Sequence, residues 1–261
     1  ATLQVADPTT HALEDAPTVA GQSITGNNVR TRAHSFSYPA NAQWVRLNVS
    51  KLTAGSGGLA LDEIDIHDVS NGSQDTWLFF GDSITAFAYD RNTPADQPSF
   101  AEVIHAAHPS YFPAMIDAGI GSELSVDGNG RLQQLFDLNP DYHFVALGYG
   151  TNDSWGTGKD PAGFTVTMQS LVDQIKASGR VPVLARIPYA PIMPDHEAIP
   201  AFNTALDGLT TKNSLSTEAD LYTFFFNNPQ DLMMDMVHPL PAGRIGMNQI
   251  WAAACDSAYA P

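Results

Sequence analysis

The sequence predicts an α/β fold, in which a parallel sheet lies between two layers of helices, preceded by a smaller all-β region. After residue 75, short apolar runs alternate with segments of helical period, and several runs end in loops that contain glycine and aspartate. This alternation is typical of a parallel sheet that helices cover on both faces. We therefore predict two domains, a β-sandwich over residues 1–75 and a three-layer α/β/α domain over residues 76–261.

The predicted β-sandwich depends on two runs, residues 43–49 and 59–66, in which apolar and polar side chains alternate. A period of two indicates strands with one buried face, and the glycines and serines between the runs are typical of turns. Acidic side chains in the second run fit solvent-facing strand positions better than calcium ligands. We therefore predict no metal there.

The strands and helices of the second domain follow from the period of their apolar residues. The expected strands are short apolar runs, at residues 77–80, 112–116, 143–147, 181–185 and 221–226. The expected helices lie at residues 100–107, 164–175 and 201–209. In this order the elements alternate, as a parallel sheet requires.

The first strand of this domain leads into Gly81-Asp82-Ser83-Ile84-Thr85, and a second polar segment near the C-terminus reads Asp235-Met236-Val237-His238-Pro239. A serine hydroxyl is a poor nucleophile at neutral pH unless a neutral imidazole takes its proton and a carboxylate orients that imidazole. His238 and Asp235 can supply both groups from one short loop. These residues predict a Ser-His-Asp triad.

Two further blocks close predicted strands, Asp117-Ala118-Gly119-Ile120-Gly121-Ser122 and Leu147-Gly148-Tyr149-Gly150-Thr151-Asn152-Asp153. Ligands of open α/β sheets bind at the carboxyl ends of the strands, so these blocks are expected to meet. Together the four blocks resemble those of the SGNH hydrolases, the GDSL esterase and lipase superfamily. Ser83 matches its first block, Asn152 its third, and Asp235 with His238 its last.

The resemblance implies an SGNH or flavodoxin-like fold and a role for each matched residue. Ser83 is expected to be the nucleophile, His238 the base and Asp235 the group that orients His238. The Ser83 N–H, a backbone N–H of the second block and the Asn152 amide are expected to form the oxyanion hole. Because His238 must be neutral to accept a proton, we expect activity to fall in acid.

The second block departs from the family pattern, which is roughly Asn-x-Gly-Ile-x-Gly. Asp117 stands in the place of Asn, and Ser122 stands in the place of the last Gly. Every residue except proline carries a backbone N–H, so a donor survives the substitution. Either Gly121 or Ser122 is expected to supply it.

Aromatic residues on both sides of Asn152 are candidates for a substrate pocket. Tyr149 and Trp155 could line an acyl or sugar site, although core packing is equally expected for Tyr149. Asp82 and Asp153 lie inside the motifs, but carboxylates at strand-to-helix turns usually cap the helix or accept local hydrogen bonds. We predict structural roles for both.

Two histidines and one cysteine remain as candidates for chemistry, and we expect structural roles for them. His105 and His108 lie three apart in a predicted helix without a third ligand, so we expect a helix-surface pair. Cys255, the single cysteine, lies in an apolar segment and is expected to be a buried thiol. We predict neither a cofactor nor a metal.

The composition limits the partners. With 28 acidic and 12 basic residues, the formal net charge is −16, which disfavours nucleic acid and anionic membranes. No run reaches the roughly 18 apolar residues of a membrane span. The chain starts at Ala1 without Met, which suggests a processed or trimmed product, and we expect a soluble, secreted protein. Its partner would be a small-molecule or polysaccharide ester, and its oligomeric state cannot be predicted.

The resemblance implies a serine esterase but does not select its substrate. The run at 59–66 also resembles strands of jelly-roll modules that precede the catalytic domain in some carbohydrate esterases. This favours short acyl esters, above all acetyl esters, on carbohydrate. A lipase or thioesterase that acts on lipid or small-molecule esters is the alternative, because the motifs are common to all of these enzymes.

Two other classes of protein fit the sequence less well. An α/β-hydrolase would carry a Gly-x-Ser-x-Gly elbow, which this chain lacks. A non-catalytic glycan-binding protein would not need Ser83, Asn152, Asp235 and His238 together.

Overall fold

The structure is a computed structural model, and it describes residues 2–6, 13–15, 45–48, 75–89, 97–111, 113–155, 159–191 and 198–259. The chain divides into two compact units, Ala1–Ile64 and Asp65–Pro261. The predicted domains, residues 1–75 and 76–261, have a later boundary. Because most residues around this boundary lie outside the described ranges, the domain limits stay a prediction.

The first unit contains an antiparallel sheet with the strand order β2-β1-β3. Its strands are β1 (Thr2–Ala6), β2 (Leu13–Asp15) and β3 (Val45–Asn48). β3 lies within the predicted strand at 43–49. The predicted strand at 59–66 lies outside the described residues, and the sandwich to which it would belong stays a prediction.

In the described part of the second unit, four parallel strands form a sheet with the order β5-β4-β6-β7. They are β4 (Thr76–Gly81), β5 (Ala114–Asp117), β6 (Phe144–Gly148) and β7 (Val181–Leu184). The chain passes from β4 to β5 on one side and then to β6 on the other. The loops after these strands therefore diverge at β4, where ligands of such sheets bind. The predicted parallel α/β fold is confirmed.

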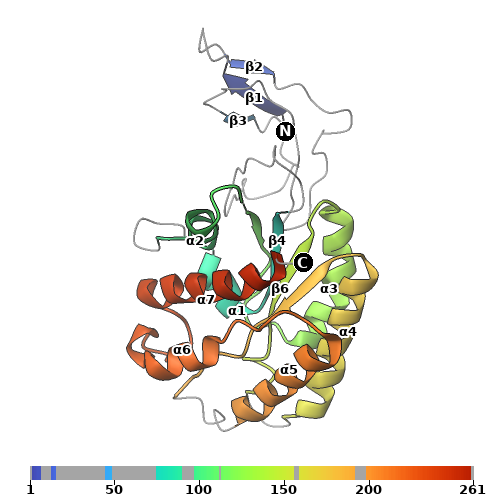
Figure 1. Cartoon of the computed structure of the whole chain (residues 1–261), viewed down its shortest axis with the longest axis vertical. Helices are drawn as coiled ribbons and strands as arrows, with labels where there is room; N and C mark the ends of the chain where they lie inside the picture. Colours follow the sequence, from blue (N-terminus) through green and yellow to red (C-terminus); the bar gives the residue numbers. More distant parts are fainter. Residues whose placement is uncertain are drawn as a thin grey trace, which may run out of the picture. The chain divides into compact units, whose positions relative to one another are not determined.

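Helices lie on both sides of this sheet (Figure 1). One layer contains α1 (Ser83–Tyr89), α2 (Phe100–Ala107), α6 (Leu221–Asn227) and α7 (Pro241–Tyr259). The other contains α3 (Ser125–Leu138), α4 (Pro161–Ala177) and α5 (Ile199–Asn213). The predicted helices at 100–107, 164–175 and 201–209 are confirmed, the last two as parts of longer helices.

The predicted strand at 221–226 is wrong, because these residues form α6. The Asp220 side chain accepts a hydrogen bond from the Thr223 N–H over 3.1 Å and caps the helix. Leu221 and Phe225, four apart, are buried on one helical face. The aromatic composition suggested a strand, but the chain joins the sheet here only through an isolated bridge at Ala219.

β4 is one of the two inner strands of the described sheet, and all of its residues are buried. Phe79 packs edge-on against Trp251 of α7, with ring centroids 5.5 Å apart. Phe80 contacts the opposite layer, where the Arg131 guanidinium of α3 lies 4.2 Å from the centre of its ring. The strand that carries Ser83 at its end is therefore held from both sides.

Cys255 is fully buried in α7, as predicted for a structural thiol. Burial raises the pKa of the thiol, so the reactive thiolate is disfavoured. The residue therefore acts as a small apolar side chain in the core.

Candidate active site

Ser83 is the first residue of α1 and lies directly beyond the carboxyl end of β4. The turn is so tight that a Cβ on Gly81 would lie 2.1 Å from Thr85 Oγ1 and 2.5 Å from the carbonyl oxygen of Gly148. Only glycine leaves room for this approach. The first N–H groups of an α-helix have no partner within the helix, which makes the Ser83 N–H a suitable oxyanion donor.

The three side chains of the predicted triad form a continuous chain of hydrogen bonds. Ser83 Oγ and His238 Nε2 are 2.9 Å apart, and His238 Nδ1 and Asp235 Oδ2 are 2.7 Å apart. When Nδ1–H donates to the carboxylate, Nε2 can accept the proton of the serine hydroxyl. The structure thus brings together residues that lie 155 positions apart in the sequence.

The loop that carries Asp235 and His238 is fixed by its own backbone. The Met233 N–H donates to the carbonyl oxygen of His238 over 2.7 Å. Met236, between the two catalytic candidates, has a φ of 58° and turns the chain. Asp235 Oδ1 accepts from the N–H groups of Val237 and His238. The carboxylate and the imidazole are therefore aligned by local bonds.

The surroundings keep Asp235 ionised. Burial acts to raise its pKa, but hydrogen bonds from the His238 ring and from the N–H groups of Val237 and His238 outweigh it and lower the pKa. An ionised carboxylate can stabilise the imidazolium that forms during catalysis. The Phe87 ring of α1 packs against His238, with ring centroids 4.7 Å apart, and limits how the imidazole can move.

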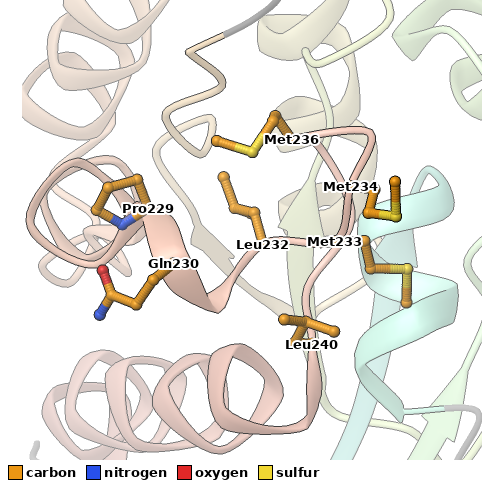
Figure 2. Close-up of a pocket in the computed structure, with 7 residues that line it drawn as sticks. All are labelled: Pro229, Gln230, Leu232, Met233, Met234, Met236 and Leu240. Carbon is orange, nitrogen blue, oxygen red and sulfur yellow. The ribbon is translucent and has the colours of Figure 1, made fainter.

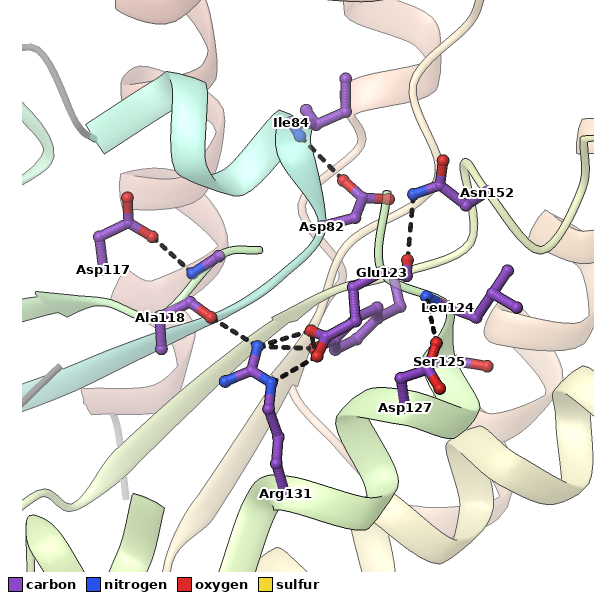
Figure 3. Close-up of polar contacts among 12 residues, drawn as sticks. Asp82, Ile84, Asp117, Ala118, Glu123, Leu124, Ser125, Asp127, Arg131 and Asn152 are labelled. Atoms are coloured by element: carbon purple, nitrogen blue, oxygen red, sulfur yellow. Dashed lines mark hydrogen bonds and ion pairs between the residues drawn. The ribbon is translucent and has the colours of Figure 1, made fainter. Parts of the chain in front are cut away.

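The loop of the second block is held against β4. The Ile120 N–H donates to the carbonyl oxygen of Gly81 over 3.0 Å. Asp117, which replaces the Asn of the family pattern, accepts the Gly119 N–H over 2.7 Å (Figure 3). The aspartate therefore still anchors the loop that leads to the candidate backbone donors.

The two candidate donors, Gly121 and Ser122, are both exposed. Ser122 has a φ of 62°, in the left-handed region that favours glycine. A glycine in the family pattern fits this conformation better than the serine of this chain. A Cβ on Gly121 would meet no atom within 4 Å.

We expect the Ser122→Gly variant to have a free energy of unfolding about 0.5–1 kcal/mol higher than the wild type. A left-handed conformation costs about 1–2 kcal/mol for a residue other than glycine, and the larger entropy of unfolded glycine offsets part of the gain. Urea denaturation measures this change. Ser110→Gly, at an exposed serine without positive φ, is the control and should not stabilise. Equal effects of the two changes would contradict the prediction.

The third block is tied to the second by side chains. Asn152 Nδ2 donates to the carbonyl oxygen of Glu123 over 3.0 Å (Figure 3). A carboxamide has two N–H groups, so Asn152 can bind Glu123 with one and a reacting oxygen with the other. Asp153 accepts from the Ser125 N–H and, over 2.5 Å, from Ser125 Oγ, which fixes the start of α3. This contact agrees with the structural role predicted for Asp153.

Asp82 is buried directly before Ser83. Its Oδ1 accepts the Ile84 N–H over 2.9 Å, the local contact expected of a carboxylate at this turn. The pKa of Asp82 is raised to about 7, because burial and, to a smaller extent, the charge of Asp153 outweigh the hydrogen bond from Ile84, which lowers it. Asp82 is therefore mostly protonated in weak acid.

We expect the wild-type free energy of unfolding to fall by about 2–4 kcal/mol, relative to that of Asp82→Asn, as the pH rises from about 4 to 7. The pKa of Asp82 is about 7 in the folded state and about 3.9 in the unfolded state. Between these values the folded state binds more protons than the unfolded state, so the free energy of unfolding falls as the pH rises. Urea denaturation across this range measures the difference, with Asp173→Asn as an exposed control. If the free energies of unfolding of wild type and Asp82→Asn change in parallel with pH, the prediction is wrong.

The two predicted pocket residues lie in different environments. Tyr149 is 2% exposed, and its hydroxyl donates to Glu123 Oε2 over 2.5 Å. Its side chain therefore belongs to the core, the alternative that its sequence left open. Trp155 is 49% exposed, and its backbone N–H donates to the carbonyl oxygen of Asn152 over 3.2 Å. Trp155 is therefore accessible and lies in the loop that carries Asn152.

His105 and His108 bind protein groups. His105 Nδ1 lies 2.9 Å from the carbonyl oxygen of Tyr111, and His108 Nε2 lies 2.5 Å from Asp256 Oδ1. Among the described residues, no group of three or more His, Cys, Asp or Glu side chains is placed to hold a metal ion. In the same part of the chain, no helix has the length and apolar character needed to span a membrane.

Residues 79–244, which include all four blocks, match the model of the GDSL-like lipase/acylhydrolase family. The chain belongs to this family. Membership of the GDSL-like family identifies the protein as a carboxylic ester hydrolase, the enzyme class predicted from the sequence. A search of curated proteins found no match.

Solved structures share the fold of this GDSL-family chain. A lipase/acylhydrolase from Enterococcus faecalis has 22% identity and a TM-score of 0.56, covering 68% of this chain and 93% of its own. The acetyl xylan esterase AlAXEase has 23% identity and a TM-score of 0.53, covering 70% and 99%. The acetylxylan esterase Axe2 from Geobacillus stearothermophilus has 18% identity and a TM-score of 0.57, covering 69% and 93%. At these identities the likeness supports the fold alone.

Sequence reasoning missed three residues beside the candidate site of this GDSL-family hydrolase. Phe87 packs on His238, while the buried Glu123 and the partly buried Arg131 form an ion pair next to the second block. A Glu directly after the second block and an Arg eight positions later were the available signal. Nothing in the local sequence indicates that Glu123 is buried and Arg131 partly buried.

Proposed function

We propose that this hydrolase is a serine esterase that removes short acyl groups, above all acetyl, from carbohydrate. Ser83 is the nucleophile, His238 the general base and acid, and Asp235 the residue that orients His238. The hydrogen bonds of 2.9 and 2.7 Å that link these side chains carry the proposal.

In the proposed reaction, Ser83 Oγ attacks the ester carbonyl carbon while His238 Nε2 takes the hydroxyl proton. The imidazolium then gives this proton to the leaving alcohol, and an acyl-serine remains. Water attacks the acyl group while His238 takes its proton, and the imidazolium returns this proton to Ser83 Oγ as the acyl–oxygen bond breaks and the free acid leaves. The ionised Asp235 stabilises the imidazolium in both steps.

The negative oxygen of the tetrahedral intermediate requires fixed donors. The Ser83 N–H, the N–H of Gly121 or Ser122, and the second N–H of the Asn152 amide fill this role in the proposal. Such donors act on the transition state more than on the bound ester, so they change turnover more than affinity.

We expect Asn152→Ala to lower kcat by about 10²–10³ with a small change in KM, because one oxyanion donor is lost. The matched control is Asn228→Ala, since Asn228 Nδ2 also donates to a backbone carbonyl, that of Phe224, over 2.9 Å. Steady-state hydrolysis of p-nitrophenyl acetate measures both variants. Equal kcat values for Asn152→Ala and wild type would remove Asn152 from the oxyanion hole.

Two observations support acetylated carbohydrate as the substrate. Two of the structures with the same fold are named acetyl xylan esterases. The exposed indole of Trp155, next to Asn152, offers a large flat apolar face with a polar edge. We include in this proposal a secreted, soluble protein with an accessory β-sandwich at its N-terminus.

A panel of p-nitrophenyl esters of increasing acyl length, followed by acetylated xylan, tests the proposal. We expect the highest kcat/KM for acetyl, release of acetate from the polymer, and loss of both activities in Ser83→Ala. A preference for long acyl chains would overturn the acetyl assignment. Failure to hydrolyse any ester would overturn the esterase assignment.

A second candidate, a lipase or thioesterase, is favoured by an apolar groove of about 640 Å³ beside the catalytic loop (Figure 2). The groove is lined by Pro229, Gln230, Leu232, Met233, Met234, Met236 and Leu240. Flexible methionines can adapt to a longer acyl chain. If the groove binds such a chain, Met234→Ser should lower kcat/KM for the octanoyl ester and leave the acetyl ester unchanged.

A further inference from the structure

A buried cluster of three polar side chains, Glu123, Arg131 and Tyr149, lies behind the candidate oxyanion hole. Arg131 Nε donates to Glu123 Oε1 over 2.6 Å, and Arg131 Nη2 donates to Oε2 over 2.6 Å. The Tyr149 hydroxyl donates to the same Oε2 over 2.5 Å. The Glu123 carboxylate is therefore held on both oxygens by two residues from different elements.

The cluster is shielded from solvent. The side chains of Glu123 and Arg131 are 7% and 19% exposed. Burial also raises the pKa of the Tyr149 phenol, so Tyr149 keeps the proton that it donates. A buried ion pair contributes little to stability compared with apolar residues of similar size, but its bidentate geometry fixes positions. A role in geometry therefore fits this cluster better than a role in stability.

The backbone next to the cluster carries the two candidate donors of the second block, Gly121 and Ser122. Glu123 directly follows Ser122, and its carbonyl oxygen accepts the Asn152 amide over 3.0 Å. Arg131 Nη2 also donates to the carbonyl oxygen of Ala118 over 2.7 Å. One guanidinium thus binds both ends of the loop that contains Gly121 and Ser122.

We propose that Glu123, Arg131 and Tyr149 are positioning residues that hold the second-block N–H and the Asn152 amide in line for the oxyanion. The inference rests on the proposed esterase function. The three side chains act through the backbone at Glu123 and Ala118 and do not touch the substrate. Their loss displaces donors, and a displacement of about 1 Å can cost up to about 10²-fold in rate.

The first test is a double-mutant cycle with p-nitrophenyl acetate. Tyr149→Phe removes one oxygen atom, and we expect kcat to fall about 10- to 100-fold with KM changed less than about 3-fold. In an Asn152→Ala background, the same change should cost at least about 5-fold less, because one of the positioned donors is already absent. Equal losses in both backgrounds would overturn the proposal.

The chain offers matched controls at the opposite end of the sheet. The Tyr259 hydroxyl, which is partly buried, donates to the Asp75 carboxylate just before β4. The Arg180 guanidinium lies 4.1 Å from the centre of the Phe136 ring and donates to the carbonyl oxygen of Tyr142 over 2.7 Å. Tyr259→Phe and Arg180→Lys should leave kcat within about 3-fold of the wild type, while Tyr149→Phe and Arg131→Lys should not. Equal kcat losses in the two pairs would overturn the proposal.

Two glycines of α3 give a test that leaves the cluster residues intact. A Cβ on Gly128 would lie 2.4 Å from the Tyr149 hydroxyl oxygen, whereas one on Gly130 would meet no atom within 4 Å. Gly128→Ala should therefore lower kcat, and Gly130→Ala should keep it unchanged. If Gly128→Ala keeps wild-type kcat, the proposal is wrong.

A readout independent of catalysis separates this inference from the proposed function. The side-chain amide signals of Asn152 in ¹⁵N-labelled protein can be assigned by their loss in Asn152→Ala. We expect Tyr149→Phe, but not Tyr259→Phe, to shift them. Shifted signals in a protein that hydrolyses no ester would retain the positioning role and overturn the esterase function. Unshifted signals would overturn the positioning role.

Discussion

Ser83→Ala is expected to abolish ester hydrolysis, with kcat lowered by about 10⁶-fold, the loss typical of a serine nucleophile. Without Oγ, no covalent intermediate can form, and His238 Nε2 loses the hydroxyl that lies 2.9 Å away. The oxyanion donors remain and can support only a slow attack by water. Hydrolysis of p-nitrophenyl acetate measures the loss.

Covalent labelling makes this result specific to Ser83. A fluorophosphonate should add one adduct to the wild-type protein, detectable by intact mass, and none to Ser83→Ala. Ser178→Ala is the control, because Ser178 also donates one hydrogen bond, to the carbonyl oxygen of Ile175 at the end of α4. It should keep both activity and labelling. Labelled or active Ser83→Ala protein would show that another residue is the nucleophile.

Asp235→Asn is expected to lower kcat by about 10³–10⁴-fold. The Asn side chain can still accept the backbone N–H groups that bind Asp235 Oδ1, so the loop should keep its shape. It cannot stabilise an imidazolium as a carboxylate does, and its NH₂ group favours the wrong tautomer of His238. The loss should therefore appear in kcat without a matching loss of stability.

Asp231→Asn is the control for this variant, because Asp231 lies in the 3₁₀ turn before the same loop and uses its backbone carbonyl to bind the Leu240 N–H. It should keep wild-type kcat. Since the Asp235 pKa is lowered, the wild-type carboxylate should remain charged in weak acid. If Asp235→Asn keeps kcat within about 10-fold of the wild type, Asp235 is not the triad acid.

Features that depend on short stretches of chain could be predicted from the sequence. The apolar run of β4, the helical period of α4 and the glycine of the tight turn before Ser83 are local. Polar sequence blocks that follow parallel strands are also expected to lie close together, because the carboxyl ends of those strands lie at one edge of the sheet. Ser83 and Asn152 belong to this class, whereas Asp235 and His238 lie in a loop after a 3₁₀ turn and were predicted from their own short block.

Features that depend on competition between local and distant contacts could not be predicted. Residues 221–226 have the composition of a strand, but the Asp220 cap and the burial of Leu221 and Phe225 on one face select a helix. The positive φ of Ser122 is likewise invisible in its sequence.

The sequence alone thus determined the fold class, the hydrolase family and the candidate residues for chemistry, because each depends on periodicity or on a short block. Only the tertiary structure decided which side chains pack behind the candidate oxyanion hole. Glu123 and Tyr149 are 26 positions apart in the sequence, and the hydrogen bond between them is buried. The sequence does not indicate whether a charged residue is buried or exposed to solvent. A buried, paired charge can fix a local geometry, whereas an exposed charge only forms part of the solvated surface.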